Sequence, residues 1–126
     1  METKKITIES IDKMHLVSVE EIVYCQTDSP YLTVCLTNGL RLMECKTLKL
    51  WKESVADVPF LIQISQSVVV NVKYIKAVHY ESRNVEMEDG THLRYTIKKS
   101  EIKELIKAAL AVKADDESGF LKKQAK

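Results

Sequence analysis

Apolar and polar positions alternate on both sides of two short glycine turns, Asn38-Gly39 and Asp89-Gly90. Before the first turn the apolar positions are Leu32, Val34 and Leu36, and after it Leu40 and Leu42; around the second they are Val85, Met87, Leu93, Tyr95 and Ile97. Alternate residues of a strand point to opposite faces, and the type I′ hairpin turn favours Asn-Gly and Asp-Gly because both its central residues have positive φ. The pattern predicts two antiparallel hairpins, each with one solvated face.

Further short runs rich in β-branched and aromatic residues predict additional strands. We place them at Lys5–Glu9, Leu16–Val19, Ile22–Gln26 and Leu61–Ile64, with Ile75–Tyr80 leading into the second hairpin. Because the connections between them are short, all of these strands should pair in the antiparallel sense.

Two segments have helical spacing instead. Thr47 can cap a short helix on which Leu48, Trp51 and Val55 share one face, and Pro59 closes the segment that follows. Ser100 can cap a longer helix near the C-terminus. Its apolar stripe consists of Ile102, Leu105, Ile106, Ala109 and Leu110. Such a stripe must pack on a sheet or on a second subunit.

The fold class that follows is mostly β, with small antiparallel sheets, one short helix and one C-terminal helix. The 126 residues, 45% hydrophobic and 29% charged, suit a single soluble domain. After Ala114 the sequence becomes DDESGFLKKQAK, which is mostly polar. We therefore expect a domain over residues 1–113 and a flexible tail over residues 114–126.

Several classes of protein are disfavoured by what the sequence lacks. No apolar run approaches the ~20 residues of a membrane span, and the polar N-terminus METKKITIES has no signal-peptide core, so we expect a cytoplasmic protein. Cys25, Cys35 and Cys45 are odd in number, ten residues apart, and form no C-x-x-C pair. They are interpreted as free thiols that act as small core side chains, with redox sensing as the alternative.

Catalytic chemistry has little support. The histidines His15, His79 and His92 stand in no metal or nucleophile motif, and three glycines cannot build a phosphate-binding loop. The acidic residues Glu86, Glu88 and Asp89 suit a solvated strand end and turn better than a catalytic or metal site. We expect no enzyme activity, no metal, no cofactor and no small-molecule substrate.

A net charge of +1 does not by itself indicate a nucleic-acid partner. One local arrangement does indicate such a partner. The solvent-exposed face of the strand after Asp89-Gly90 carries a row formed by His92, Arg94, Thr96 and Lys98. Arg and Lys in such a row can reach phosphates or the guanine edge. The alternative is an ordinary solvated strand face.

A longer set of segments resembles the LytTR family of bacterial DNA-binding domains. The signature is FLIQISQSVVVNVKYI from Phe60, followed by VEMEDGTHLRYTI; the earlier YCQTDSPYLTVCLTNG and TLKLWKESV match the family's preceding hairpin and short helix. The resemblance runs from about Ile6 to Ile106. It implies an elongated array of antiparallel sheets and a transcription regulator that reads double-stranded DNA with loops and strand ends. It also implies two domains on direct repeats, with bending of the DNA.

The same resemblance assigns contact sites by position. The loop before Leu32 supplies Ser29 and Tyr31, beside Pro30. The family's I-H-R-S turn becomes Ile64-Ser65-Gln66-Ser67, and the basic position after the last strand is Lys98, next to Lys99. With Arg94, the expected DNA contacts are Ser29, Tyr31, Ser65, Gln66, Arg94, Lys98 and Lys99. Asn71 takes the place of an asparagine that we assign to structure.

The departure at Ser65-Gln66 changes the expected chemistry. It removes up to two positive charges from the centre of the interface, although Gln can still pair with adenine. Ser65 and Gln66 can alternatively do no more than satisfy a tight turn. A receiver domain, common in this family, has no room before Ile6, so we expect either a free-standing regulator or a module of a longer response regulator.

Two functions remain to be separated by the structure. DNA binding predicts that Arg41, Lys73, Arg94, Lys98 and Lys99 gather on one edge with Gln66. A protein-interaction or dimerisation module using the helix over Ile102–Leu110 predicts scattered charges and an exposed apolar patch. A homodimer is compatible with either.

Overall fold

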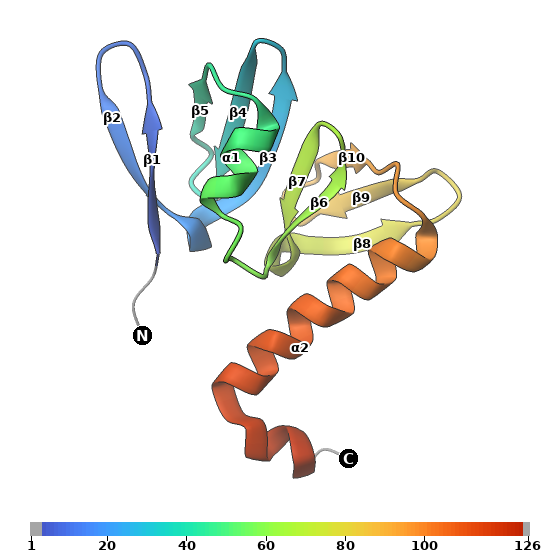
Figure 1. The fold of residues 1–126 in the computed structure, drawn as a ribbon. Helices are drawn as coiled ribbons and strands as arrows, with labels where there is room; N and C mark the ends of the chain where they lie inside the picture. The colour runs from blue at the N-terminus through green and yellow to red at the C-terminus, as the bar shows by residue number, and fades with distance from the viewer. Residues whose placement is uncertain (1–3, 125–126) are drawn as a thin grey trace.

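Three antiparallel sheets lie side by side in the computed structural model, with a long helix leaving at one end (Figure 1). The structure describes the backbone of residues 4–124 and the side chains of residues 4–111. The strands are β1 (Lys5–Glu9), β2 (Met14–Ser18), β3 (Ile22–Asp28), β4 (Tyr31–Leu36), β5 (Arg41–Glu44), β6 (Leu61–Ser65), β7 (Val68–Asn71), β8 (Ile75–His79), β9 (Asn84–Met87) and β10 (His92–Arg94). The helices are α1 (Leu48–Ser54) and α2 (Lys99–Gln124), with single 3₁₀ turns at Val19–Glu21 and Val72–Tyr74. The predicted fold class is confirmed.

The middle sheet organises the molecule, because apolar clusters cover both of its faces. Its strand order is β5-β4-β3-β7-β6, with the pair β1-β2 on one side and the sheet β10-β9-β8 on the other. One cluster joins the middle sheet to β1, β2 and α1 through residues such as Ile8, Leu32 and Trp51. The second joins its other face to the small sheet and the start of α2, through residues such as Val70 and Tyr95.

Burial on both faces explains the strand that sequence analysis missed. All four residues of β7 are buried, since β7 lies between β3 and β6 with a cluster on each face. A strand in that position has no reason to alternate, so Val68–Val70 is a continuous apolar run without the period of two that marked the other strands. The same burial corrects the predicted wet face of β4, where Cys35 packs into the second cluster.

Both glycine turns are hairpins, but not of type I′. Gly39 and Gly90 have φ of +88° and +95°, whereas Asn38 and Asp89 keep negative φ. Each loop has three residues: the Leu36 N–H donates to the Leu40 carbonyl (2.9 Å) and the Met87 N–H to the Thr91 carbonyl (2.8 Å). The Asn38 and Asp89 side chains accept hydrogen bonds from the amides two residues later, which favours this glycine-bulge form.

The helix α1 is as predicted. Thr47 Oγ1 accepts a hydrogen bond from the Leu50 amide at 3.2 Å, while Leu48 and Trp51 are buried in the first cluster with Val55. The start of α2 differs from prediction. The Ile102 N–H donates to the Lys98 carbonyl at 3.0 Å, so the helix begins at Lys99 and Ser100 lies inside its first turn.

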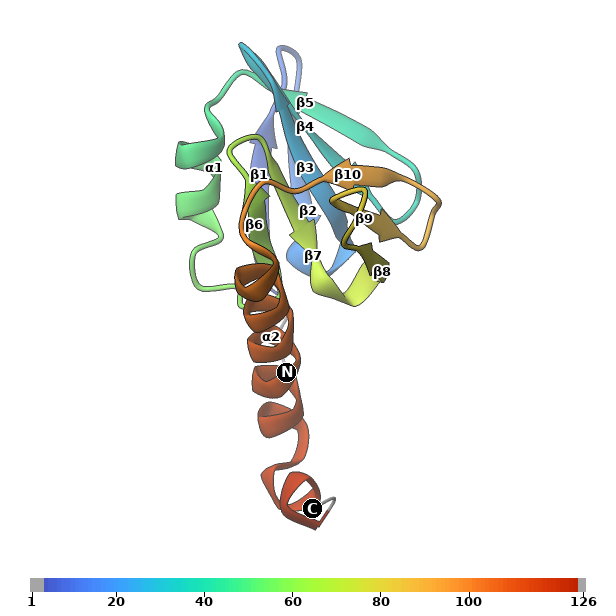
Figure 2. The ribbon, with the colours of Figure 1, turned by 90° about the vertical axis from the view of Figure 1, so that its right-hand side faces the viewer.

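The apolar stripe of α2 packs mainly on its own domain. Ile102 and Ala109 are buried in the second cluster and Leu105 and Ile106 rest against it, whereas Leu110 is exposed. The backbone of α2 continues helical to Gln124, beyond the point where the composition changes, and extends away from the sheets (Figure 2). The division of the chain after residue 113 stays a prediction, and residues 125–126 lie outside those described.

Candidate nucleic-acid interface

Two turns meet at one end of the middle sheet. Gln26 of β3 pairs with Val68 of β7, and beyond that pair the Thr27 N–H donates to the Ser67 carbonyl at 2.9 Å. The β3–β4 turn, Ser29-Pro30 with a cis peptide bond, and the β6–β7 turn around Gln66 therefore stand next to each other. Both turns point the same way in Figure 1.

Ser65 shapes the β6–β7 turn from inside. Its side chain is only 9% exposed, and its Oγ accepts a hydrogen bond from the Ser67 amide at 3.1 Å. Its carbonyl accepts another from Gln63 Nε2 at 2.9 Å. These contacts favour the structural alternative for Ser65, whose hydroxyl is already used within the turn.

Gln66 is the opposite case. It is exposed, and no hydrogen bond found among residues 4–111 uses its side-chain amide. Three shallow hollows meet at this residue. We call the area that they line together the Gln66 surface. Its polar and charged residues are Gln26, Thr27, Ser29, Lys46, Thr47, Lys49, Lys52, Glu53, Gln63, Ser65, Gln66, Ser67, Arg94 and Thr96.

The chain between β10 and α2 forms one side of the Gln66 surface. The Thr96 N–H donates to the Ile64 carbonyl at 3.0 Å, which holds this segment against the end of β6 (Figure 2). Although β10 ends at Arg94, Leu93 and Tyr95 stay buried while Arg94 and Thr96 stay exposed. The predicted row of exposed side chains is present, and Arg94 with Thr96 brings it to Gln66.

The other side of the Gln66 surface comes from α1 and the residues before it, which sequence analysis missed. Lys46, Lys49 and Lys52 follow one another at intervals of three and line the hollows that contain Gln66. Residues at that interval share a helix face. The spacing was readable from the sequence, but only the fold shows that this face lies beside the β6–β7 turn.

Other predicted residues lie elsewhere. Tyr31 is exposed and lines a groove along β5, and Arg41 begins β5 at the opposite edge of the middle sheet from β6. Lys73 pairs with Glu20 at the other end of β7. Lys99 Nζ lies 4.3 Å from the centre of the Tyr80 ring. Of the five basic residues expected around Gln66, Arg94 is the one that lines the hollows with it, and the exposed Lys98 lies two residues past Thr96.

Asn71 has the structural role expected of it. Its side chain is fully buried, Nδ2 donates to the Ile22 carbonyl at 2.8 Å, and Oδ1 accepts from the Lys73 amide at 2.9 Å. It therefore ties the end of β7 to β3 and stabilises the 3₁₀ turn that follows.

The shifted pKa values have structural causes. Burial raises the pKa of Tyr24 to about 12 and raises that of the Cys25 thiol. The hydrogen bond from His79 lowers the pKa of Glu86 on the small sheet. Cys25 and Cys35 are buried free thiols, as predicted, whereas Cys45 is exposed because it follows the last residue of β5.

Within the part of the chain that the structure describes, no group of three or more His, Cys, Asp or Glu side chains is arranged to hold a metal ion. None of the helices in that part has the length and apolar character needed to cross a membrane.

Comparison with known proteins agrees with this fold. Residues 12–109 match the family model of the LytTr DNA-binding domain. The fold is similar to a solved LytTr DNA-binding domain from Bacillus cereus, with a TM-score of 0.67 and 18% sequence identity, over 84% of this chain and 98% of that one. No curated protein matches the chain.

Proposed function

The chain belongs to the LytTR family of DNA-binding domains, and from this premise we propose that it is a sequence-specific bacterial transcription regulator that reads duplex DNA with the Gln66 surface. It recognises DNA through turns and strand ends, since the Gln66 surface contains two turns, the end of β10 and one helix face.

The observation that carries the proposal is an unused side-chain amide flanked by four cationic side chains and by one carboxylate, that of Glu53. A Gln amide can donate to and accept from adenine in the major groove, which gives it the geometry of a base-reading group. Arg94 on one side and Lys46, Lys49 and Lys52 on the other suit the phosphates of the flanking strands. Ser29 of the β3–β4 turn is the second polar group placed to contact DNA.

Lys49 and Lys52 of α1, with Lys46 just before the helix, compensate for the departure from the family pattern. Where the family has a His-Arg pair, this chain has Ser65 and Gln66, and Ser65 is turned inward. The positive charge lost from the turn is supplied by the neighbouring helix face. Phosphate affinity is then retained while the base-reading group changes.

Further parts of the proposal concern the assembly on DNA. Two copies bind direct repeats on one side of the duplex. Bending of the DNA allows the Gln66 surface of each copy to contact its own repeat. The additional contacts that such a bend can reach are Tyr31, Lys98 and Lys99. The response-regulator role, the cytoplasmic location and the homodimer stay predictions.

The test is binding of the full chain to a randomised duplex pool, measured by fluorescence anisotropy at several salt concentrations, followed by sequencing of the bound fraction. We expect enriched repeats about one or two helical turns apart, and a linear fall of log affinity with log salt. Gln66→Ala should relax the preference at one base position by about 1–3 kcal/mol.

Lys76→Ala is the matched control for charge, because Lys76 is an exposed lysine of β8 that pairs with Glu86 away from the two turns. It should leave the salt dependence unchanged. Absence of binding at low salt, or a Gln66→Ala variant with the base preference of the parent, contradicts the proposal.

A further inference from the structure

The strand β5 forms an open edge of the middle sheet, paired on one side only, with β4. In an antiparallel ladder, residues alternate between those bonded to the partner strand and those whose backbone groups point away. The Leu36 N–H donates to the Leu40 carbonyl, so every second pair from there, Val34–Leu42 and Leu32–Glu44, is a hydrogen-bonded pair. The backbone N–H and C=O groups of Arg41 and Met43 therefore point away from β4, toward the open edge. The N–H of Cys45 does so too, because it lies in the same peptide unit as the Glu44 carbonyl, which points to β4.

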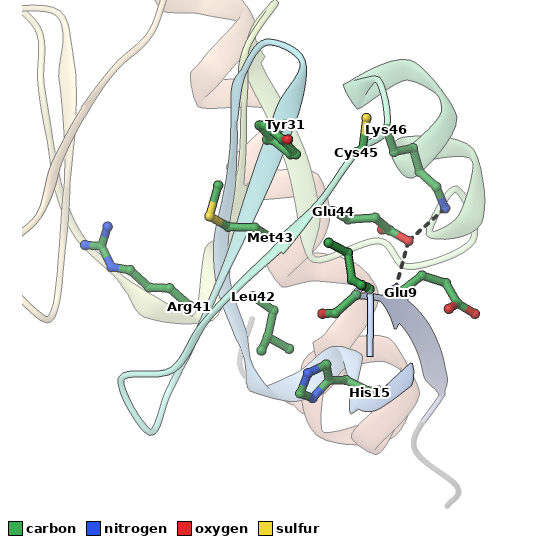
Figure 3. Close-up of a pocket in the computed structure, with 11 residues that line it drawn as sticks. Glu9, His15, Tyr31, Arg41, Leu42, Met43, Glu44, Cys45 and Lys46 are labelled. Carbon is green, nitrogen blue, oxygen red and sulfur yellow. Dashed lines mark hydrogen bonds and ion pairs between the residues drawn. The ribbon is translucent and has the colours of Figure 1, made fainter. Parts of the chain in front are cut away.

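A groove runs along this edge, and apolar side chains stand beside it (Figure 3). Ile11 of the β1–β2 turn is fully exposed, and Met43 and Tyr31 are 53% and 47% exposed. In Figure 3, Met43 and Tyr31 lie on one side of β5, with Leu42 and His15 on the other. An extended chain placed along the edge would cover apolar surface on both sides.

A buried carboxylate also lines the groove. Glu44 is only 5% exposed; its Oε2 accepts a hydrogen bond from the Glu9 amide at 3.1 Å and lies 3.5 Å from Lys46 Nζ. Its Oε1 is buried with no hydrogen-bond partner. A buried carboxylate with an unpaired oxygen is costly, and a cationic donor is the group that best compensates it.

We propose that the open edge of β5 binds an extended segment of a partner protein that carries a lysine or arginine. The segment adds a sixth strand to the middle sheet by hydrogen bonding to the backbone of Arg41, Met43 and Cys45. Alternate side chains of the segment face Met43 and Tyr31. On the other face the basic side chain pairs with the Glu44 carboxylate, which turns toward the groove so that its buried Oε1 becomes accessible.

A second copy of the chain fits this edge less well. Two β5 strands paired symmetrically about Met43 would place a leucine opposite Glu44, because Leu42 and Glu44 are equally far from Met43. A leucine side chain has no donor, so Glu44 Oε1 would stay unpaired. In this register the carboxylate favours a different partner sequence; a pairing about Cys45 would set Lys46 opposite Glu44, but Lys46 already pairs with Glu44 of its own chain.

The experiment selects displayed random peptides of about ten residues on the full chain, the length of a long strand. Selected peptides are then synthesised, labelled and measured by fluorescence anisotropy. We expect alternating apolar residues with one basic residue. Peptide binding should slow hydrogen exchange at the Met43 and Cys45 amides of the unmodified protein.

Two variants separate the parts of the site. Met43→Pro removes an N–H that points to the open edge, so the ladder with β4 is kept, and it should weaken peptide binding about tenfold or more. Glu44→Gln should weaken the basic peptide about tenfold but not its lysine-to-glutamine analogue. Leu110→Ala, which removes an exposed apolar side chain from α2, is the control and should bind like the parent.

The outcomes that overturn the proposal are equally definite. They are a selection without binders, binders unaffected by Met43→Pro with unprotected Met43 and Cys45 amides, and binders indifferent to Glu44→Gln. A concentration-dependent dimer in sedimentation, lost in Met43→Pro, would assign the edge to a second copy instead. DNA binding by the same variants is a separate readout, so failure here leaves the proposed function untouched.

Discussion

The Gln66 surface and the groove along β5 are two exposed regions of one sheet with opposite chemistry. At the Gln66 surface, backbone groups are satisfied within turns and the unused groups are a side-chain amide and cations. Along β5 the unused groups belong to the backbone and to one buried carboxylate, and the exposed neighbours include the apolar side chains of Ile11, Tyr31 and Met43.

This difference separates two kinds of partner. Duplex DNA offers phosphates and base edges but no backbone amides, so it suits exposed side chains with charge and hydrogen-bonding capacity. A protein segment offers a backbone ladder and apolar side chains, which suit an open edge strand. Lys46 belongs to both regions, since it lines the hollow of Ser29 and Gln66 and also pairs with Glu44.

The largest effect should come from removing the cations of the Gln66 surface. In the variant Lys49→Ala, Lys52→Ala, Arg94→Ala we expect DNA affinity at low salt to fall by about two orders of magnitude, because three charge-assisted contacts are lost. The slope of log affinity against log salt should become shallower by about three units. Binding of the β5 peptide should not change; a similar loss in both assays would mean that the two regions are not independent.

The neighbours Ser65 and Gln66 give the next effect, as a contrast within one turn. Gln66→Ala should relax one base preference and leave thermal unfolding nearly unchanged, because its side chain makes no contact that stabilises the turn. Ser65→Ala should lower the free energy of unfolding by about 1–2 kcal/mol, since the partly buried Ser67 amide loses its acceptor, and keep the base preference. Both variants are measured by selection on DNA pools and by denaturant unfolding. A changed base preference in Ser65→Ala, or a loss of stability in Gln66→Ala, would contradict the prediction.

The smallest effect is expected for Lys46→Ala, which tests the residue that the two regions share. Loss of one phosphate contact should reduce the salt slope for DNA by about one unit. The basic peptide should bind a few-fold more tightly, on the order of 0.5–1 kcal/mol, because Glu44 loses its competing cation. Anisotropy titrations with DNA and peptide give both numbers, and a change in one of the two titrations alone would place Lys46 in that region only.

Much of the fold could be predicted because much of it is amphipathic. The hairpins around Asn38-Gly39 and Asp89-Gly90, the strand β1 and the helix α1 each bury one face, which leaves a period in the sequence. The strand β7 buries two faces and leaves none. The predicted turn type, I′, was wrong. Asn38 and Asp89 use their side chains to accept amide hydrogen bonds, and the type I′ rule, which considers only positive φ, does not include such bonds.

The candidate site was predictable only in part, for a similar reason. Ser29, Ser65, Gln66 and Arg94 do come together, yet identical reasoning placed Ser65 and Gln66 as equals, and only burial distinguishes them. Lys46, Lys49 and Lys52 were missed because their regular spacing is common on solvated helices. Lys73 was wrongly expected near Gln66. It pairs with Glu20, which is too far away in the sequence for a local pattern to reveal the pair.

The sequence by itself determined the local periods, the caps and turns, and the membership in a family of DNA-binding domains, because these depend on neighbours along the chain. The tertiary structure alone decided which side chains are left unused. The Ser65 hydroxyl is hydrogen-bonded within its turn, whereas the Gln66 amide is not. Glu44 is buried with one oxygen unpaired beside an open strand edge. Those outcomes depend on contacts between strands distant in sequence, which no local pattern encodes.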